Sequence, residues 1–378
     1  GDHQGSGRVG GDGVMAKLGE VCDFYAGTGF PNEYQGRVTG KYPFYKVGDI
    51  SKNVLEGNRE LKTCANYVEE DVVQKLKGSI LPPKTIVFAK IGEALKLNRR
   101  AITSCECLVD NNVMGIKAQN VRLNDEYLFY WLQNLNLSDY SESTTVPSVK
   151  KSRLQNIEIN VSPLEEQEKV VSTLNNLSSL ILARKKQLSK LDELVKARFV
   201  EMFGDPYMNN KHYPLRKGES FFKLSNGKTV PEDKRLSNGV PAYGGNGISW
   251  YTNESLFNHD TIVVGRVGFQ SGNVHIAKGP LWITDNAMYM SSCDFSQYNL
   301  IFLINLMEHI DFTKFQDAGD LKKITQKPFM QYEYICPPLP LQNQFAAFVE
   351  RVDRQKQTVQ QSLEKLELMK KALMQEYF

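Results

Sequence analysis

The sequence contains little that could form a metal site, a disulfide framework or a membrane span. Its five histidines fall singly, and of its six cysteines the one close pair, Cys105 and Cys107, has no second pair at zinc-finger spacing. No apolar run approaches the ~20 residues of a membrane span, and the chain does not open with a secretory signal. We therefore expect reduced cysteines, no bound metal and a cytoplasmic location.

Two fragments imitate cofactor-binding loops of enzymes, and each lacks a required part. Asn226-Gly227-Lys228-Thr229 looks like the end of a Walker A loop, but Phe222 stands where that motif needs its first glycine. Phe24-Tyr25-Ala26-Gly27-Thr28-Gly29 looks like a methyl-donor loop, but no Asn-Pro-Pro-Tyr or Asp-Pro-Pro-Tyr follows it. No Ser/His/Asp or Cys/His arrangement stands out either. The sequence thus predicts ordinary loops at both places and no catalytic residues.

The composition is that of a folded protein with two domains. The chain has 378 residues, of which 41% are hydrophobic and 24% charged, and this excludes a disordered chain. The net charge of +3 permits nucleic-acid binding only through local basic surfaces. Residues 1–14 are Gly-rich without apolar periodicity, so we expect a flexible leader before a true start at Met15.

The most informative feature of the sequence is a repeat with an offset of 175 residues. Pro163-Leu164-Glu165-Glu166-Gln167 opens one heptad-patterned segment, and Pro338-Leu339-Pro340-Leu341-Gln342 opens another that runs in the same register to Phe378. Leu188 and Leu363 are one of several identical pairs at this offset. A duplicated unit predicts a partner or ligand that is itself repeated, and duplex DNA with two half-sites fits this requirement.

Each repeated segment is predicted to form one long helix. In the first segment Ser162 fits the N-cap, Pro163 the first helical position and Glu165 the capping box, while Gly204-Asp205-Pro206 supplies a stop. The second segment lacks the capping box and carries an extra proline, so we expect its first turn to differ. A helix over 164–203 is ~60 Å long, which exceeds one turn of DNA.

Apolar residues recur in both segments at alternating spacings of four and three, which is typical of a coiled coil. Polar residues interrupt both seams, so two helices paired through them leave surface for other helices. The predicted coiled-coil and partner-binding residues are Val170, Leu174, Leu177, Ile181, Leu188, Leu191, Val195, Phe345, Val349, Val352, Leu363, Leu366 and Leu373.

The stretches outside the helices also resemble each other, which predicts two similar domains of mixed α/β (α+β) class. The stretches 84–92 and 260–268 are both β-branched strands that end in a basic residue and a glycine. Each domain then has a helix-like segment, 126–137 or 298–309, followed by a pair of lysines, and we match Lys150-Lys151 with Lys322-Lys323. The predicted order is a leader (1–14), domain 1 (15–162), spacer helix 1 (163–204), domain 2 (205–337) and spacer helix 2 (338–378), with the helices forming an antiparallel coiled coil.

Loops beside the strands combine basic, amide and glycine residues, as nucleic-acid contacts do. Arg can bridge guanine, Asn or Gln can bridge adenine, and Lys and Ser suit phosphates. Such loops can equally be solvated surface, and their occurrence in both domains is what favours DNA. The predicted DNA-binding residues are Lys90, Lys96, Asn98, Arg99, Arg100, Ser148, Lys150, Lys151, Tyr243, Gly244, Asn246, Arg266, Gln270, Ser271, Asn273, Lys322 and Lys323.

The order and double occurrence of these motifs resemble the specificity subunits of type I restriction-modification systems. The resemblance covers about 15–378, and the first domain departs from it at 89–92, where Lys90 replaces the family's arginine. The segments that carry it are the two Pro-Leu-x-x-Gln openings at Pro163 and Pro338, Gly265-Arg266-Val267-Gly268, Ile283-Thr284-Asp285-Asn286 and Tyr243-Gly244-Gly245-Asn246-Gly247.

The resemblance implies a non-catalytic subunit of a multisubunit complex that methylates or cleaves DNA. Two target-recognition domains each read a few base pairs of a bipartite site in double-stranded DNA, and the helix pair fixes the unread spacer. Two methyltransferase subunits, which hold S-adenosylmethionine and methylate adenine, dock on the helices, and restriction subunits that use ATP and Mg²⁺ join for cleavage. No cofactor is expected on this chain. The alternative is a non-catalytic coiled-coil scaffold whose domains bind a non-DNA ligand such as a peptide or a sugar.

Overall fold

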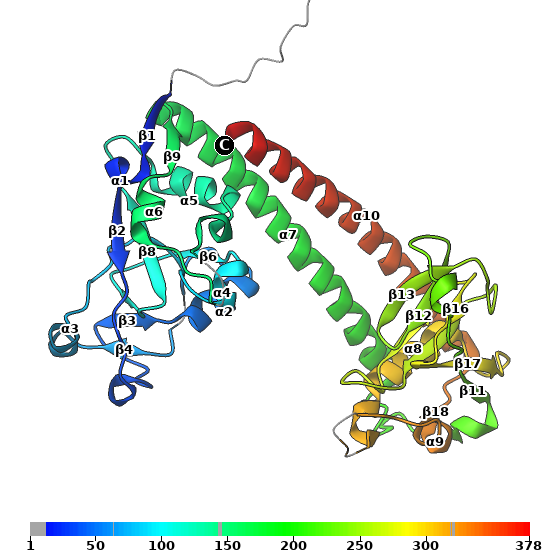
Figure 1. Ribbon diagram of the computed structural model, residues 1–378. Coiled ribbons are helices and arrows are strands. Elements are labelled where there is room, and N and C mark those ends of the chain that lie inside the picture. The colour runs from blue at the N-terminus through cyan, green and yellow to red at the C-terminus, as the bar shows by residue number, and fades with distance from the viewer. Residues whose placement is uncertain (1–12, 63, 143–145, 318, 320–321) are drawn as a thin grey trace, which may run out of the picture. The chain divides into compact units, whose positions relative to one another are not determined.

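The structure is a computed structural model that describes residues 13–62, 64–142, 146–317, 319 and 322–378. The chain divides into two compact units: unit 1 is the chain up to Lys185 together with Ser362–Phe378, and unit 2 is Lys186–Gln361. Two long helices, α7 (Leu164–Phe203) and α10 (Leu339–Tyr377), each give one part to each unit (Figure 1). Each unit therefore combines one strand-rich domain with a segment of both helices.

The strand-rich domain of unit 1 contains three small sheets. The four-stranded antiparallel sheet has the order β2-β8-β5-β6, the three-stranded sheet has the order β4-β3-β7 with β3 and β7 parallel, and β1 pairs with β9. Its strands are β1 (Val14–Lys17), β2 (Cys22–Ala26), β3 (Tyr42–Tyr45), β4 (Tyr67–Val68), β5 (Ile86–Ala89), β6 (Arg100–Ile102), β7 (Leu108–Val109), β8 (Val113–Ala118) and β9 (Glu158–Val161).

The domain of unit 2 repeats this arrangement strand for strand. Its sheets have the orders β11-β17-β14-β15, β13-β12-β16 with β12 and β16 parallel, and β10-β18. Its strands are β10 (Leu215–Lys217), β11 (Phe222–Asn226), β12 (Val240–Gly244), β13 (Gly247–Thr252), β14 (Thr261–Gly265), β15 (Val274–Ala277), β16 (Trp282–Ile283), β17 (Ala287–Cys293) and β18 (Glu333–Ile335). The predicted class, two similar domains that mix helices and strands, is confirmed.

Each domain also has one well-capped helix, α5 (Asp125–Asn134) or α8 (Leu300–His309). The side-chain oxygen of Asn124 accepts hydrogen bonds from two backbone N–H groups at the start of α5, and Asn299 does the same for α8. These are the two helix-like segments that the sequence predicts, and the first ends earlier than expected, at Asn134. The shorter helices are α1 (Leu18–Val21), α2 (Val47–Leu55), α3 (Glu70–Leu76), α4 (Glu93–Lys96), α6 (Lys151–Gln155) and α9 (Lys327–Gln331).

A buried glutamine explains the repeated Pro-Leu-x-x-Gln motif. The Gln167 side chain accepts a hydrogen bond from the backbone N–H of Asn124 (2.8 Å) and donates to the carbonyls of Arg122 (2.9 Å) and Ser162 (2.7 Å). The equivalent Gln342 accepts from the N–H of Asn299 (2.9 Å) and donates to two carbonyls in the same way. Each glutamine therefore ties the first turn of a long helix to the N-cap of α5 or α8.

The first turns of the two long helices are alike, contrary to the expectation from the sequence. The carbonyl of Pro163 accepts the N–H of Gln167 (3.1 Å), and the carbonyl of Pro338 accepts the N–H of Gln342 (3.2 Å). The capping box predicted at Ser162 is wrong, because α7 begins one residue later and Glu165 forms an ion pair with Lys169 instead. The predicted stop is confirmed at Gly204, whose φ of +75° suits glycine.

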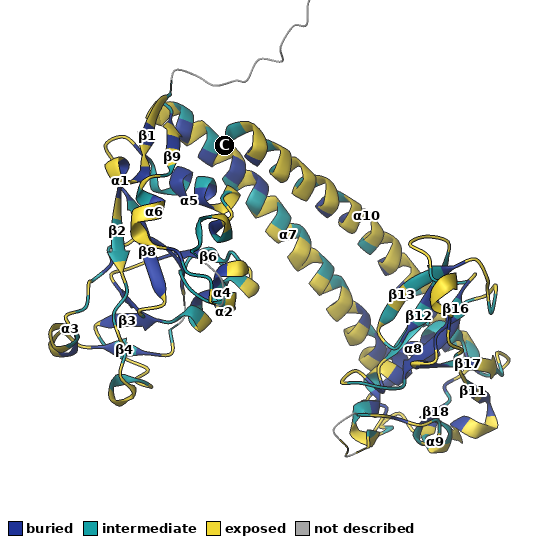
Figure 2. Cartoon of the chain, in the orientation of Figure 1, coloured by how far each residue is buried: buried dark blue, intermediate teal, exposed yellow. Residues whose placement is uncertain are grey.

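Within each unit the segments of α7 and α10 pack together and run antiparallel. In unit 2 the ring of Phe203 lies 5.5 Å from that of Phe345, and Asp192 forms an ion pair with Lys356. The second contact lies earlier in α7 but later in α10, so the two helices run in opposite directions. In unit 1 Lys185 forms an ion pair with Glu367 (2.8 Å). None of the thirteen predicted seam residues is exposed, and Figure 2 shows buried positions recurring along both helices.

The long helices complete the hydrophobic core of each domain. In unit 1 Val171 and Leu174 of α7 and Met374 of α10 belong to the same buried cluster as α5. In unit 2 Phe199 and Phe203 are buried among the residues of α8 and the four-stranded sheet. In the part of the chain that the structure describes, no helix has both the length and the apolar character needed to cross a membrane.

Candidate nucleic-acid interface

In both domains the structure brings the predicted basic loops together at the end of a central strand. After β5, the carbonyl of Lys90 accepts the N–H of Val149 (2.8 Å), and the N–H of Gly92 bonds to the carbonyl of Pro147 (2.8 Å). After β14, the carbonyl of Arg266 accepts the N–H of Ile324 (3.0 Å) in the equivalent position. A loop distant in sequence is therefore fixed beside the basic residue that ends each strand.

The pairing corrects one match made from the sequence. Ile91 forms a β-bridge with Ser148, and Val267 forms the corresponding bridge with Lys323. Lys323 is thus the counterpart of Ser148, and the match of Lys150-Lys151 with Lys322-Lys323 is wrong. The two lysine pairs look alike in sequence, but backbone pairing rather than residue type fixes the equivalence.

The two enzyme-like fragments begin at the ends of β2 and β11 and continue into equivalent loops. The N–H of Thr28 bonds to the carbonyl of Val109 (2.9 Å), and the N–H of Lys228 bonds to the carbonyl of Ile283 (2.8 Å). A Cβ atom at Gly27 would lie 1.7 Å from the carbonyl oxygen of Asp110, and one at Gly227 would lie 2.0 Å from that of Thr284. These glycines allow the loops to approach the backbone closely.

In unit 1, four of the predicted DNA-binding residues surround one hollow. Lys90, Ser148, Lys150 and Lys151 line a cavity of about 330 Å³. The ammonium of Lys150 forms an ion pair with Glu142 (2.6 Å), whereas Lys151 is exposed. This hollow is the part of domain 1 where basic side chains converge.

The other predicted residues of domain 1 lie elsewhere. Asn98 and Arg100 line a separate hollow beside α7 and α10, half-buried Arg99 lies between them in the chain, and Lys96 forms an ion pair with Glu93 (2.7 Å). Arg100 is only 5% exposed, and burial lowers its pKa to about 10.

The buried position of Arg100 argues against its assignment as a DNA contact. Its guanidinium donates to the carbonyls of Asn98 (3.0 Å) and Leu135 (2.6 Å), so it joins the turn before β6 to the end of α5. We therefore correct the assignment: Arg100 stabilises the fold of domain 1.

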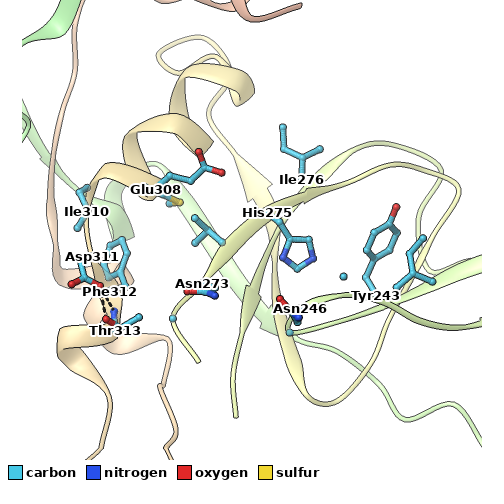
Figure 3. A pocket seen from close by; sticks show the side chains of 16 residues that line it. Tyr243, Asn246, Asn273, His275, Ile276, Glu308, Ile310, Asp311, Phe312 and Thr313 are labelled. Atoms are coloured by element: carbon cyan, nitrogen blue, oxygen red, sulfur yellow. Dashed lines mark hydrogen bonds between the residues drawn. The ribbon is translucent and has the colours of Figure 1, made fainter. Parts of the chain in front are cut away.

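In unit 2, several predicted residues line a larger cavity of about 640 Å³. Tyr243 belongs to β12 and Asn246 to the turn before β13. Asn273 lies just before β15, and the end of α8 lines the opposite side (Figure 3). Gly244 is the last residue of β12, and the turn that follows it lies close to the end of β14. A Cβ atom at Gly245 would lie only 2.9 Å from the Cα of Gly265.

The cavity also contains a residue that the sequence does not single out. The ring of His275 lies 6.1 Å from that of Tyr243 (Figure 3), and its Nε2 atom is buried without a hydrogen-bond partner among the described residues. Burial lowers the pKa of this imidazole. A lone histidine in a strand gives no signal in the sequence, because its surroundings come from distant segments.

The remaining predicted residues of domain 2 differ in exposure. Gln270 and Lys323 are exposed, Lys322 and Arg266 are half-buried, and a guanidinium nitrogen of Arg266 lies 3.4 Å from the carbonyl of Asp285. Ser271 is completely buried, and its carbonyl accepts from the Gln316 side chain. Its side chain is therefore not placed for a DNA contact, and we correct this assignment as well: the backbone N–H and carbonyl of Ser271 hold the loop in place.

Comparison with known proteins places these features in a family. The model of the "Type I restriction modification DNA specificity domain" matches the chain over residues 12–193 and again over 211–368.

No group of three or more His, Cys, Asp or Glu residues that could hold a metal ion occurs in the described ranges.

Curated relatives agree with the family match. A putative type I restriction enzyme MjaX specificity subunit of Methanocaldococcus jannaschii is 22% identical over 88% of this chain and 85% of its own length. The MjaVIII specificity subunit of the same organism is 25% identical over 60% of this chain, but the match spans only 48% of that relative.

Two solved structures share the fold. A type I restriction-modification S subunit from M. genitalium is 15% identical, with a TM-score of 0.64 over 97% of this chain and 96% of that one. A second chain, from a study of the assembly of the type I R-M system, has a TM-score of 0.53 over 97% of this chain and 98% of that one, also at 15% identity.

Proposed function

The chain belongs to the family of type I restriction-modification specificity subunits, and from this premise we propose that it binds double-stranded DNA at a bipartite site. The observation that carries the proposal is the duplicated domain with an equivalent strand-end loop in each copy. Two copies of one scaffold with different loops are suited to two different half-sites.

The loops supply the chemistry that such reading requires. Arg266 and Gln270 carry side chains that can hydrogen-bond to base edges in the major groove, while Lys151 and Lys323 can contact phosphates. The net charge of +3 is small, so the attraction to DNA comes from these local clusters. Restriction-modification systems act on DNA inside the cell, so we further propose that this chain acts in the cytoplasm.

The helices supply a second, repeated surface for partner proteins. Leu194 of α7 and Met369 of α10 are equivalent in the repeat, and both are exposed, by 46% and 55%. We propose that two methyltransferase subunits dock on the helix pair and bring S-adenosylmethionine, and that ATP- and Mg²⁺-dependent restriction subunits join the assembly. This chain then contributes no catalytic group.

Selection from random duplexes tests the proposal. The chain is co-expressed with its methyltransferase partner, and the bound duplexes are sequenced. We expect two short conserved blocks separated by a gap of fixed length. No preference among the duplexes would refute DNA reading and favour a scaffold that binds another ligand.

The same selection tests the role of one residue. Arg266→Ala should weaken the preference at a single block, by roughly 10-fold, since a bidentate contact with a base is worth ~1–3 kcal/mol. Arg216→Ala, at an exposed arginine on β10, is the matched control and should change neither block. Equal weakening on unrelated DNA would show that Arg266 contacts only phosphate.

A further inference from the structure

Phe269 is the most exposed large apolar side chain in the described part of the chain, with 92% of its surface accessible. It lies in the loop between β14 and β15, three residues after Arg266 and next to the exposed Gln270. A phenylalanine in water normally folds back against neighbouring apolar groups, because its burial is favourable. Its exposure here needs a physical reason.

The backbone of the loop prevents this collapse. The N–H of Gly268 bonds to the carbonyl of Lys322 (2.8 Å), and the N–H of Ser271 bonds back to Gly268 (3.0 Å). The side chain of Gln316 donates to the carbonyls of Phe269 (3.3 Å) and Ser271 (2.6 Å). The loop is fixed on both sides of Phe269, which therefore projects from a rigid support.

Basic and amide side chains lie along the loop that carries Phe269. Arg266 and Lys322 lie at the base of the loop, Lys323 is exposed beside them, and Gln270 is exposed next to the ring. A protein interface typically has its aromatic residue inside a larger apolar patch. A ring flanked by cations and an amide instead fits a ligand with stacked apolar rings and negative phosphates.

Domain 1 has a different element at the equivalent position. After Gly92 the chain forms the short helix α4 (Glu93–Lys96), in which Leu95 is buried. No aromatic residue occurs between Gly92 and Arg100. The exposed apolar residue of this segment is Leu97 (54%), so the exposed aromatic ring distinguishes the second domain.

We propose that Phe269 inserts between two adjacent base pairs of the half-site read by the second domain. Apolar side chains inserted in this way partly unstack a base step, and the loss is offset by stacking on the ring and by closer contacts to the bent duplex. Pyrimidine–purine steps unstack most easily, so the insertion also selects such a step. The inference rests on the proposed DNA reading and adds a specificity determinant to it.

The test uses the complex with its methyltransferase partner and a duplex carrying the site recovered by selection. 2-Aminopurine replaces single bases across both half-sites in turn, and its fluorescence rises on unstacking. Flipping of the target adenine by the methyltransferase raises the signal in each half-site, so the informative signal is a rise at one further base step. We expect this rise with the wild-type chain, its loss in Phe269→Ala together with about 10-fold weaker binding, and its recovery in Phe269→Leu, which keeps an apolar wedge.

Phe295→Ala is the control, because Phe295 is also an exposed phenylalanine of unit 2 (57%). It should leave the fluorescence and the affinity unchanged. If Phe269→Ala binds and unstacks the duplex as the wild type does, the proposed insertion is wrong. Specific binding by the wild type would still support the proposed function of DNA reading. If Phe269→Ala instead loses the methyltransferase partner, the ring is a protein contact and the proposal is also wrong.

Discussion

The two buried glutamines Gln167 and Gln342 show how single residues position the recognition domains. Each satisfies one N–H group and two carbonyls that would otherwise be buried without partners. The sequence shows that these glutamines recur, but not why, because two of the three partners of each lie 43 and 45 residues earlier in the chain. The offset of 175 also relates Asn124 to Asn299. This further identity was the one sign in the sequence that these asparagines belong to the same repeated contact as the glutamines.

Gln342→Leu should lower the free energy of unfolding by roughly 3 kcal/mol, because it leaves buried backbone groups unsatisfied. Urea unfolding of the purified chain measures the change. Gln344→Leu, two positions further along the same helix and exposed, is the control and should remain within about 0.5 kcal/mol of the wild type. Equal stability of the two variants would contradict the role assigned to Gln342.

Arg100 shows the limit of reading function from residue type. Arg100→Met should destabilise domain 1 by roughly 2 kcal/mol, because the carbonyls of Asn98 and Leu135 lose a charged donor. The selected DNA sequence should stay the same. A changed half-site with unchanged stability would restore Arg100 as a DNA contact, which its exposure of 5% argues against.

At the scale of elements, the helices were the most predictable part of the molecule. The heptad pattern identifies residues that all prove to be buried or half-buried, since one face of a helix is a local property of the sequence. The strand order was not predictable, because short strands such as β7 and β16 have two residues each and pair with distant segments. Only short pieces of the domain repeat were visible in the sequence, and one of them, the lysine pair, was matched wrongly.

Leu174→Ala should cost roughly 3 kcal/mol, because Leu174 is fully buried where α7 meets domain 1. Leu180→Ala on the same helix is the control, since Leu180 is 49% exposed, and it should cost less than about 1 kcal/mol. Thermal or urea unfolding of both variants measures the difference. Similar losses of stability in the two variants would mean that the seam of α7 is not the face that packs against domain 1.

A polar cluster also holds α7 against domain 1. Arg59 forms an ion pair with Glu126 (2.9 Å), and Asn175 of α7 donates to the same carboxylate (2.6 Å). Burial by itself would raise the pKa of Glu126, but the hydrogen bond from Asn175 and the charge of Arg59 outweigh it, and the pKa lies below the ordinary 4.5.

Because the folded-state pKa of Glu126 is lowered, its contribution to stability is present above about pH 4.5 and is lost as the pH falls through the folded-state value. Glu126→Gln should therefore be less stable than the wild type near neutral pH, and the difference should shrink below about pH 4.5. Urea midpoints measured across this range test the prediction. A difference that is constant with pH would show that the carboxylate charge contributes nothing.

At the scale of the whole molecule, we propose that the domains recognise the half-sites and the helices set the spacing between them. Inserting one heptad at corresponding positions of α7 and α10 keeps the seam and lengthens each helix by ~10 Å. The gap between the two conserved blocks should then grow by about three base pairs. Recovery of the original gap by selection would show that the helices do not set the spacing.

The central claim is that this chain selects a bipartite DNA sequence, and sequencing of methylated bases in cells that carry the complete system tests it most directly. We predict one methylated motif made of two short blocks and a fixed gap, and its disappearance when the gene for this chain is deleted. Methylation that persists without the chain, or a single uninterrupted motif, would contradict the account.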